Sequence, residues 1–203
     1  MTMTNELEFQ EFPKMARLSR EIIVTEKIDG TNAQLLITED NEILVGSRNR
    51  WITPSDDNFG FAKWVEENKQ ELLKLGKGRH FGEWWGNGIQ RGYNLIKGDR
   101  RLSLFNTSRW ALFGTEPKMI PMADPRIVKY QDLLPSCVGL VPILYKGIFD
   151  TGIVDGVLED LKINGSLASP SFFNPEGIVM FHIAGNVGFK KTIKNDNLPK
   201  SKQ

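Results

Sequence analysis

The chain has 203 residues, of which 40% are hydrophobic and 25% are charged, and its formal net charge is +1. This composition is typical of a globular protein with one well-formed core. The nearly neutral charge excludes a global basic field for nucleic acids, and no apolar run approaches the roughly 20 residues that span a bilayer. A single cysteine, Cys137, excludes an internal disulfide framework. We therefore expect one domain over residues 1–203, in the cytoplasm and without a membrane partner.

The first half of the chain is predicted to form mainly antiparallel strands. Apolar and alternating runs predict strands over about 21–27, 33–38, 42–47, 80–85 and 101–113. Asp29-Gly30 marks the turn after the first of them. Apolar residues at helical spacing predict one helix over about 58–75, which Gly76 ends.

The second half is predicted to alternate helices and strands. The patterns favour a short helix over about 124–134, a strand over 138–145, a helix over 151–161 and a closing hairpin of 177–183 with 187–193. The polar, lysine-rich tail at 195–203 is predicted to be disordered. Strands interrupted by helices, with hairpins at both ends, indicate an α+β fold built on antiparallel sheets flanked by helices.

The segment from Glu26 to Asn32, with the sequence EKIDGTN, is the most informative for function. Lys27 ends the first predicted strand just before a tight turn, so its root is fixed and its tip is free, as a nucleophilic amine requires. A lysine attacks phosphorus only without its proton, so this interpretation needs cationic or desolvating neighbours. A lysine beside a turn is otherwise an ordinary surface residue.

Three later segments carry compatible chemistry. Glu83 precedes a glycine-rich loop, and a loop of this kind can approach a ligand closely. Glu176 begins a predicted strand, where a carboxylate can hold magnesium together with phosphate oxygens. Lys190 and Lys191 are adjacent on the last predicted strand, so alternation sends them to opposite faces.

These segments resemble the motifs of the covalent nucleotidyltransferases, the superfamily of DNA ligases, RNA ligases and mRNA-capping enzymes. The resemblance places motifs I, Ia, III, IIIa, IV and V, in the order of the family, at Lys27, Arg48, Glu83, Phe105, Glu176 and Lys190. The stretch FGEWWGNGIQRG, which begins at Phe81, is most similar to the RNA-ligase version of motif III, as found in the phage and viral ligases that seal nicks in double-stranded RNA. No single motif decides the assignment, but their order along the chain favours it.

The resemblance implies a role for each of these residues. Lys27 would attack the α-phosphate of ATP to form a lysyl-N-AMP intermediate, Glu176 would hold Mg²⁺ or Mn²⁺, and Lys190 would assist catalysis by contacting the phosphates. Nucleotide-binding roles are implied for Glu26, Ile28, Asn32, Arg48, Glu83, Phe105 and Lys191. Lys190 and Thr192 occupy the two positions of the family's Lys-x-Lys pattern, so Lys190 is the expected inward residue and Lys191 is the alternative.

The implied function is an ATP-dependent RNA ligase that joins 5′-phosphate and 3′-OH RNA ends. A minimal DNA ligase, a capping-type guanylyltransferase and a nucleotide- or RNA-binding module that does not seal ends stay open as alternatives. The implied fold is the nucleotidyltransferase (ATP-grasp-like) domain without an OB domain, because only residues 195–203 follow motif V. A monomer acting on RNA ends is expected, with a partner protein as one possible source of a second domain.

Overall fold

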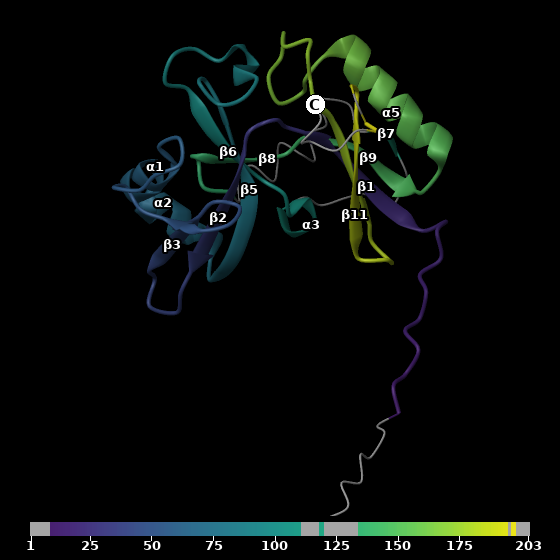
Figure 1. Ribbon diagram of the computed structural model, residues 1–203, viewed down its shortest axis with the longest axis horizontal. Helices are drawn as coiled ribbons and strands as arrows, with labels where there is room; N and C mark the ends of the chain where they lie inside the picture. The colour runs from purple at the N-terminus through teal and green to yellow at the C-terminus, as the bar shows by residue number, and fades with distance from the viewer. Residues whose placement is uncertain (1–8, 111–117, 120–133, 195, 198–203) are drawn as a thin grey trace, which may run out of the picture.

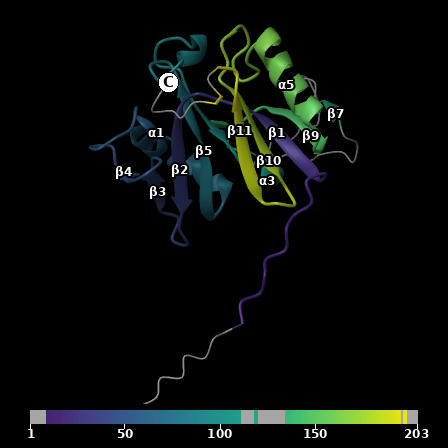
Figure 2. The same ribbon diagram turned by 45° about the vertical axis from the view of Figure 1, so that its right-hand side comes forward.

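The computed structural model describes residues 9–110, 118–119, 134–194 and 196–197. Two β-sheets lie side by side, and helices flank them (Figures 1 and 2). Nearly all neighbouring strands are antiparallel; β6 and β8 form a parallel pair. The predicted α+β fold with antiparallel sheets is therefore confirmed. No helix among these residues is long and apolar enough to cross a membrane.

The first sheet, called here the β1 sheet, has the strand order β11-β10-β1-β9-β7. Its strands are β1 (Glu21–Lys27), β7 (Lys118–Met119), β9 (Ile143–Ile148), β10 (Gly177–His182) and β11 (Val187–Thr192). One helix, α5 (Thr151–Asn164), covers one face of this sheet, and Asp150 caps it by accepting from the Ile153 backbone N–H at 3.0 Å. Apolar residues of α5 pack on Ile22, Val24 and Ile178.

The second sheet, called here the β2 sheet, has the strand order β4-β3-β2-β5-β6-β8. Its strands are β2 (Thr31–Ile37), β3 (Ile43–Gly46), β4 (Trp51–Ile52), β5 (Gly78–Gly86), β6 (Arg100–Leu104) and β8 (Val138–Leu140). The helices α1 (Phe61–Glu67) and α2 (Lys69–Leu72), with the 3₁₀ turn η1 (Leu73–Leu75), contribute to the main core against this sheet. Alternation along β2 places Ala33, Leu35 and Ile37 in that core and turns Asn32, Gln34 and Leu36 to the opposite face.

The structure changes several predicted boundaries for local reasons. The helix predicted over 58–75 is broken at Asn68, whose φ of −110° is not helical and whose side chain donates back to the Trp64 carbonyl at 2.8 Å. The strand predicted over 101–113 is wrong over 105–110, because α3 (Thr107–Trp110) starts where the Asn106 side chain accepts from the Arg109 N–H at 3.2 Å; the part over 111–113 lies outside the described residues.

Other differences concern short elements and proline. The strand predicted over 138–145 is two strands, β8 and β9, separated at Pro142, which has no N–H to offer a ladder. The two-residue strands β4 and β7 were not predicted, and α5 continues beyond the predicted end at 161. The closing hairpin matches its prediction closely. The predicted helix over 124–134 and most of the tail at 195–203 lie outside the described residues.

Candidate active site

Lys27 and Glu176 form an ion pair at the junction of the two sheets. Lys27 is the last residue of β1 and lies opposite Gly177 in the ladder, so Glu176 is beside it, and Lys27 Nζ is 2.5 Å from Glu176 Oε2. Their side chains are only 20% and 11% exposed, respectively, so the charges are shielded from bulk water. A cation and an anion that are fixed at a strand end and partly desolvated make a site suited to phosphate chemistry.

Two glycines allow the backbones around this pair to approach closely. A Cβ atom at Gly30 would come within 2.5 Å of the Trp84 carbonyl oxygen. A Cβ atom at Gly177, where φ is 155°, would come within 2.2 Å of the Lys191 carbonyl oxygen. Any larger residue at these positions would displace the turn after Lys27 or the strand start after Glu176.

Glu83 is a second carboxylate beside the pair. It lies in β5 opposite Asn32, is 9% exposed, and accepts from the Gly30 N–H at 3.1 Å and from Asn32 Nδ2 at 3.4 Å. Burial raises the pKa of Glu83 to about 7, against the lowering influence of the Lys27 cation and the Gly30 N–H. This carboxyl is therefore poised to hold or release a proton near neutral pH.

Glu26 has a different environment, although it precedes Lys27 directly. Its carboxylate is 1% exposed and accepts from Ser166 Oγ at 2.5 Å and from the backbone N–H groups of Leu167 and Ala168 at 2.8 and 3.0 Å. Burial raises the pKa of Glu26, and these hydrogen bonds lower it. Its side-chain oxygens thus accept hydrogen bonds from the segment after α5. These bonds anchor the end of β1 to that segment.

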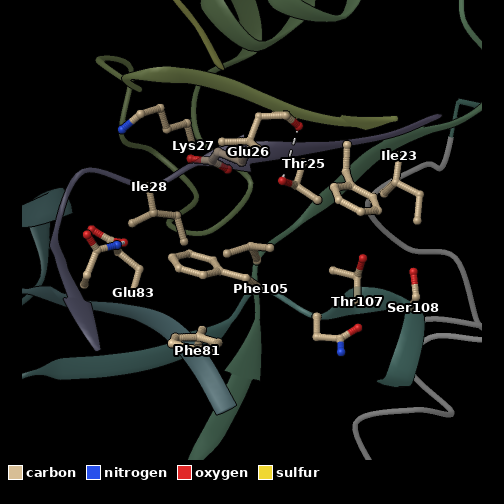
Figure 3. A pocket seen from close by; sticks show the side chains of 15 residues that line it. Ile23, Thr25, Glu26, Lys27, Ile28, Phe81, Glu83, Phe105, Thr107 and Ser108 are labelled. Atoms are coloured by element: carbon tan, nitrogen blue, oxygen red, sulfur yellow. Dashed lines mark hydrogen bonds between the residues drawn. The ribbon is translucent and has the colours of Figure 1, made fainter. Parts of the chain in front are cut away.

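A cleft of about 480 Å³ opens in front of Lys27, between the two sheets. Figure 3 shows Lys27, Glu26 and Thr25 along one wall and Phe81 and Phe105 on the other. Phe81 and Phe105 are 49% and 42% exposed, respectively, so their rings offer free apolar surface. Ile28 also lines the cleft and packs behind it with Trp85, Tyr93, Val141 and Phe172. The cleft thus combines a charged inner end with aromatic walls.

Arg91 joins the two segments that carry the ion pair. Its Nε donates to Asp29 Oδ2 at 2.9 Å, in the turn after Lys27. Its Nη1 donates to the carbonyls of Asn174 and Pro175 at 2.8 and 3.0 Å, directly before Glu176. The hydroxyl of Tyr93 accepts from the Asp29 N–H at 2.7 Å and supports the same turn.

The two adjacent lysines of β11 lie on opposite faces. Lys190 pairs in the ladder with Val179, which lines the cleft, so its side chain shares the cleft side of the β1 sheet. Lys191 pairs with Ile178 and forms an ion pair with Asp155 of α5, so it is on the helix side. The ladder therefore places Lys190 on the cleft side of the β1 sheet and Lys191 on the helix side, but Lys190 is not among the residues that line the cleft.

Most of the predicted site residues converge on the cleft. The residues among them that line it are Glu26, Lys27, Ile28, Asn32, Glu83 and Phe105, with Glu176 bonded to Lys27. Arg48 is exposed in the turn between β3 and β4 and is not among the lining residues. Sequence reasoning missed Phe81, which shares a face with Glu83 by alternation, as well as the bracing roles of Arg91 and Tyr93. It also missed Asn106, Thr107 and Ser108, because their segment was predicted as strand.

Comparison with known proteins gives a consistent result. The family model described as RNA ligase matches residues 20–194. Three structures of *Naegleria gruberi* RNA ligase mutants resemble the chain with TM-scores of 0.56 (apo), 0.55 (with AMP and Mn) and 0.53 (with ATP and Mn). Their identities are 22%, 21% and 24%, and the matches cover 86%, 86% and 91% of this chain.

The same matches cover 50%, 50% and 53% of the *Naegleria* chains, so this chain spans about half the length of the structures that it resembles. No curated protein matches the sequence. At these identities the structural likeness shows the fold of the ligase nucleotidyltransferase domain. The family model covers most of the chain, including every motif discussed above. The chain belongs to the RNA ligase family.

Proposed function

We propose that this chain is an ATP-dependent RNA ligase that joins 5′-phosphate and 3′-OH RNA ends through an AMP adduct on Lys27. The observation that carries the proposal is the position of Lys27 at the inner end of a cleft of about 480 Å³, between Glu83 and Glu176. This volume lies in the range of small-molecule sites. The *Naegleria* ligase structures with ATP or AMP and Mn support the choice of nucleotide.

In the first step, Lys27 Nζ attacks the α-phosphorus of ATP. A P–N bond forms while the bond from the α-phosphorus to the bridging oxygen breaks, and pyrophosphate leaves with that electron pair. Glu176 Oε2, 2.5 Å from the amine nitrogen, is an acceptor for the proton that the amine must lose. An oxygen of the RNA 5′-phosphate then attacks the α-phosphorus, the P–N bond breaks, and Lys27 Nζ takes up a proton again. Finally the RNA 3′-OH loses its proton and attacks the 5′-phosphorus, and AMP leaves with the electron pair of the bond that breaks.

The cleft walls suit the remaining parts of the nucleotide. Phe105 presents an exposed ring on which a purine can stack. In its ionised form, Glu83 can accept a hydrogen bond from a ribose hydroxyl, and such a charge-assisted bond is directional. Lys190 lies on the cleft side of the β1 sheet, where a cation can neutralise phosphate charge.

A divalent cation fits this site as an ion shared with the phosphates of the nucleotide. Glu176 supplies a carboxylate beside Lys27, while no group of three or more His, Cys, Asp or Glu residues in the described part of the chain forms a metal cage. Mg²⁺ characteristically binds one or two carboxylates plus substrate phosphates. When bound, Mg²⁺ or Mn²⁺ would stabilise negative charge that develops on the phosphoryl oxygens.

The proposal treats residues 20–194 as one nucleotidyltransferase unit that works as a monomer in the cytoplasm on RNA ends. The Naegleria gruberi chains are about twice as long as the region that they share with this chain. DNA joining and guanylyl transfer are the competing activities of the superfamily, and the experiment below separates them.

The test is labelling of the purified protein with radioactive ATP and Mn²⁺ or Mg²⁺, followed by denaturing electrophoresis. We expect wild-type protein to retain label and Lys27→Ala to retain none, while Lys162→Ala, an exposed lysine on α5, labels normally. Label from GTP rather than ATP would favour a guanylyltransferase, and preferential sealing of DNA nicks would favour a DNA ligase. Undiminished labelling of Lys27→Ala would refute the proposal.

A further inference from the structure

The face of the β2 sheet opposite α1 and α2 carries an ordered row of side chains that leads out of the cleft. Gln34 pairs with Phe81 on one side and with Gly46 on the other, and Gly46 pairs with Trp51. Paired residues project to the same face of a sheet, so these four positions form one line across β5, β2, β3 and β4. Three strand spacings of about 4.8 Å separate its ends by roughly 14 Å.

The line begins at the cleft and ends at an exposed tryptophan. Phe81 lines the cleft, and its carbonyl accepts from the Phe105 N–H at 2.9 Å. Trp51, at the other end, is 47% exposed, whereas Trp84 and Trp85 are each 2% exposed. A Cβ atom at Gly46 would be 3.3 Å from the Trp51 ring, so the indole lies over the glycine. The row thus runs from an aromatic side chain in the cleft to an exposed indole, with Gln34 and Gly46 between them.

Cationic side chains border this surface. The Arg79 guanidinium carbon lies 5.6 Å from the centre of the Trp51 ring. Arg79 pairs with Leu36, which in turn pairs with Leu44, so Arg79 belongs to the next row of the same face. Arg48 is exposed in the turn just before Trp51, and Arg50 is held by Asp56 at 2.5 Å. Aromatic rings beside unburied guanidinium groups match the bases and phosphates of a nucleic-acid strand.

We propose that this face, defined by Phe81, Gln34, Gly46, Trp51 and Arg79, binds an unpaired segment of the RNA substrate as it leaves the cleft. Trp51 stacks on a base, and Arg79 contacts the neighbouring phosphate. The proposal rests on the proposed function, which places an RNA end at Lys27. An unpaired strand is the specific occupant, because a base can stack on a flat indole only when it is free of its duplex neighbours.

Binding of a short fluorescein-labelled RNA of mixed sequence, followed by anisotropy without ATP, tests this surface. We expect Trp51→Ala to bind single-stranded RNA roughly 10-fold more weakly than wild type, the loss of one stacked base. Trp51→Phe retains most of the affinity but loses the quenching of tryptophan fluorescence by RNA. Arg79→Ala weakens binding and lowers the dependence on salt concentration by about one phosphate contact.

Matched controls separate this surface from general effects. Phe173→Ala, which removes an exposed aromatic after α5, and Lys162→Ala on α5 bind RNA as wild type does. Labelling by ATP, which needs no RNA, is unchanged in Trp51→Ala, so loss of labelling in the wild type would count against the proposed function and not against the surface. Equal RNA binding by Trp51→Ala and Phe173→Ala would overturn the inference. So would an equal loss of affinity for fully paired RNA, because a duplex has no free base for Trp51.

Discussion

The inner and outer ends of the cleft are built in different ways. At the inner end, Lys27, Glu83 and Arg91 are each held by bonds from a distant part of the chain. At the outer end, Phe81 and Trp51 project from regular strands and keep nearly half of their surface exposed. A group that makes or breaks bonds benefits from rigid placement, whereas a surface for a polymer requires free apolar and cationic area. Under the two proposals above, the rigid end of the cleft would carry the chemistry, and the exposed face that leads out of the cleft would hold the RNA strand.

The largest effect is expected at the ion pair of the inner end. Glu176→Gln keeps the shape of the side chain but removes its charge, so it should lower the rate of AMP labelling by at least about 100-fold, the usual cost of losing one electrostatic partner in an active site. The exposed pair Lys162–Glu159 offers the control Glu159→Gln, which should label at the wild-type rate. Equal labelling rates for the two variants would show that the charge of Glu176 does not contribute to AMP transfer.

The raised pKa of Glu83 predicts that the stability of the fold depends on pH. Its pKa is raised by burial to about 7 from the ordinary value of 4.5, so the folded protein holds a proton that the unfolded chain releases. The resulting stabilisation is complete below about pH 4.5 and is lost as the pH rises toward 7, which lowers the free energy of unfolding by about 3 kcal/mol. Urea unfolding at several pH values measures this slope.

Glu83→Gln should remove that part of the slope, because the amide does not titrate. Glu26 also has a raised pKa and contributes in the same direction, so the informative quantity is the difference between the wild type and the variant. Glu159→Gln, at an exposed position on α5, should keep the wild-type slope. A Glu83→Gln profile parallel to that of the wild type would show that Glu83 has the same pKa in the folded and unfolded protein.

Substitution of Arg91 tests whether the rigid placement of Lys27 and Glu176 contributes to the rate of AMP labelling. Arg91→Met breaks the bonds to Asp29 and to the carbonyls of Asn174 and Pro175, so we expect AMP labelling to slow by roughly 10-fold or more through misplacement of Lys27 and Glu176. The loss should appear in the maximal rate more than in the ATP concentration for half-maximal labelling. Arg17→Met, in the exposed segment before β1, is the control. A change confined to thermal stability would mean that Arg91 only supports the fold.

The smallest expected difference separates the two lysines of β11. Lys190→Ala should slow labelling by several-fold to about 10-fold, because it removes a cation on the cleft side. Lys191→Ala removes only the surface ion pair with Asp155, which contributes at most about 1 kcal/mol to stability and leaves labelling nearly unchanged. The reverse order of effects would show that β11 presents its other face to the nucleotide.

Much of the fold was predictable because its signals are local. Apolar runs and turn residues located β1, β2, β3 and the closing hairpin to within a few residues. The strand predicted beyond Leu104 failed because the side chain of Asn106 starts a helix there, a competing local bond that hydrophobic pattern does not reveal. The break at Asn68 was not predicted for the same reason, because it involves a local side-chain bond to the Trp64 carbonyl.

The sequence pointed to several residues that the structure brings together at the cleft, but it did not reveal their geometry. Alternation correctly separated Lys190 from Lys191, and motif order brought Lys27, Glu83 and Glu176 together. Spacing along the chain could not reveal that the carboxylate of Glu26 accepts a hydrogen bond from Ser166, 140 residues later. The bracing by Arg91 is equally non-local, since its partners at 174 and 175 are distant in the sequence.

The central claim is that Lys27 Nζ forms the covalent P–N bond to AMP. The most direct test is to incubate the full chain with ATP and a divalent cation, digest it under conditions that preserve P–N bonds, and locate the adduct by tandem mass spectrometry. The account predicts a single AMP on the side chain of Lys27. An adduct on any other residue, or an unmodified Lys27 in protein that has consumed ATP, would contradict it.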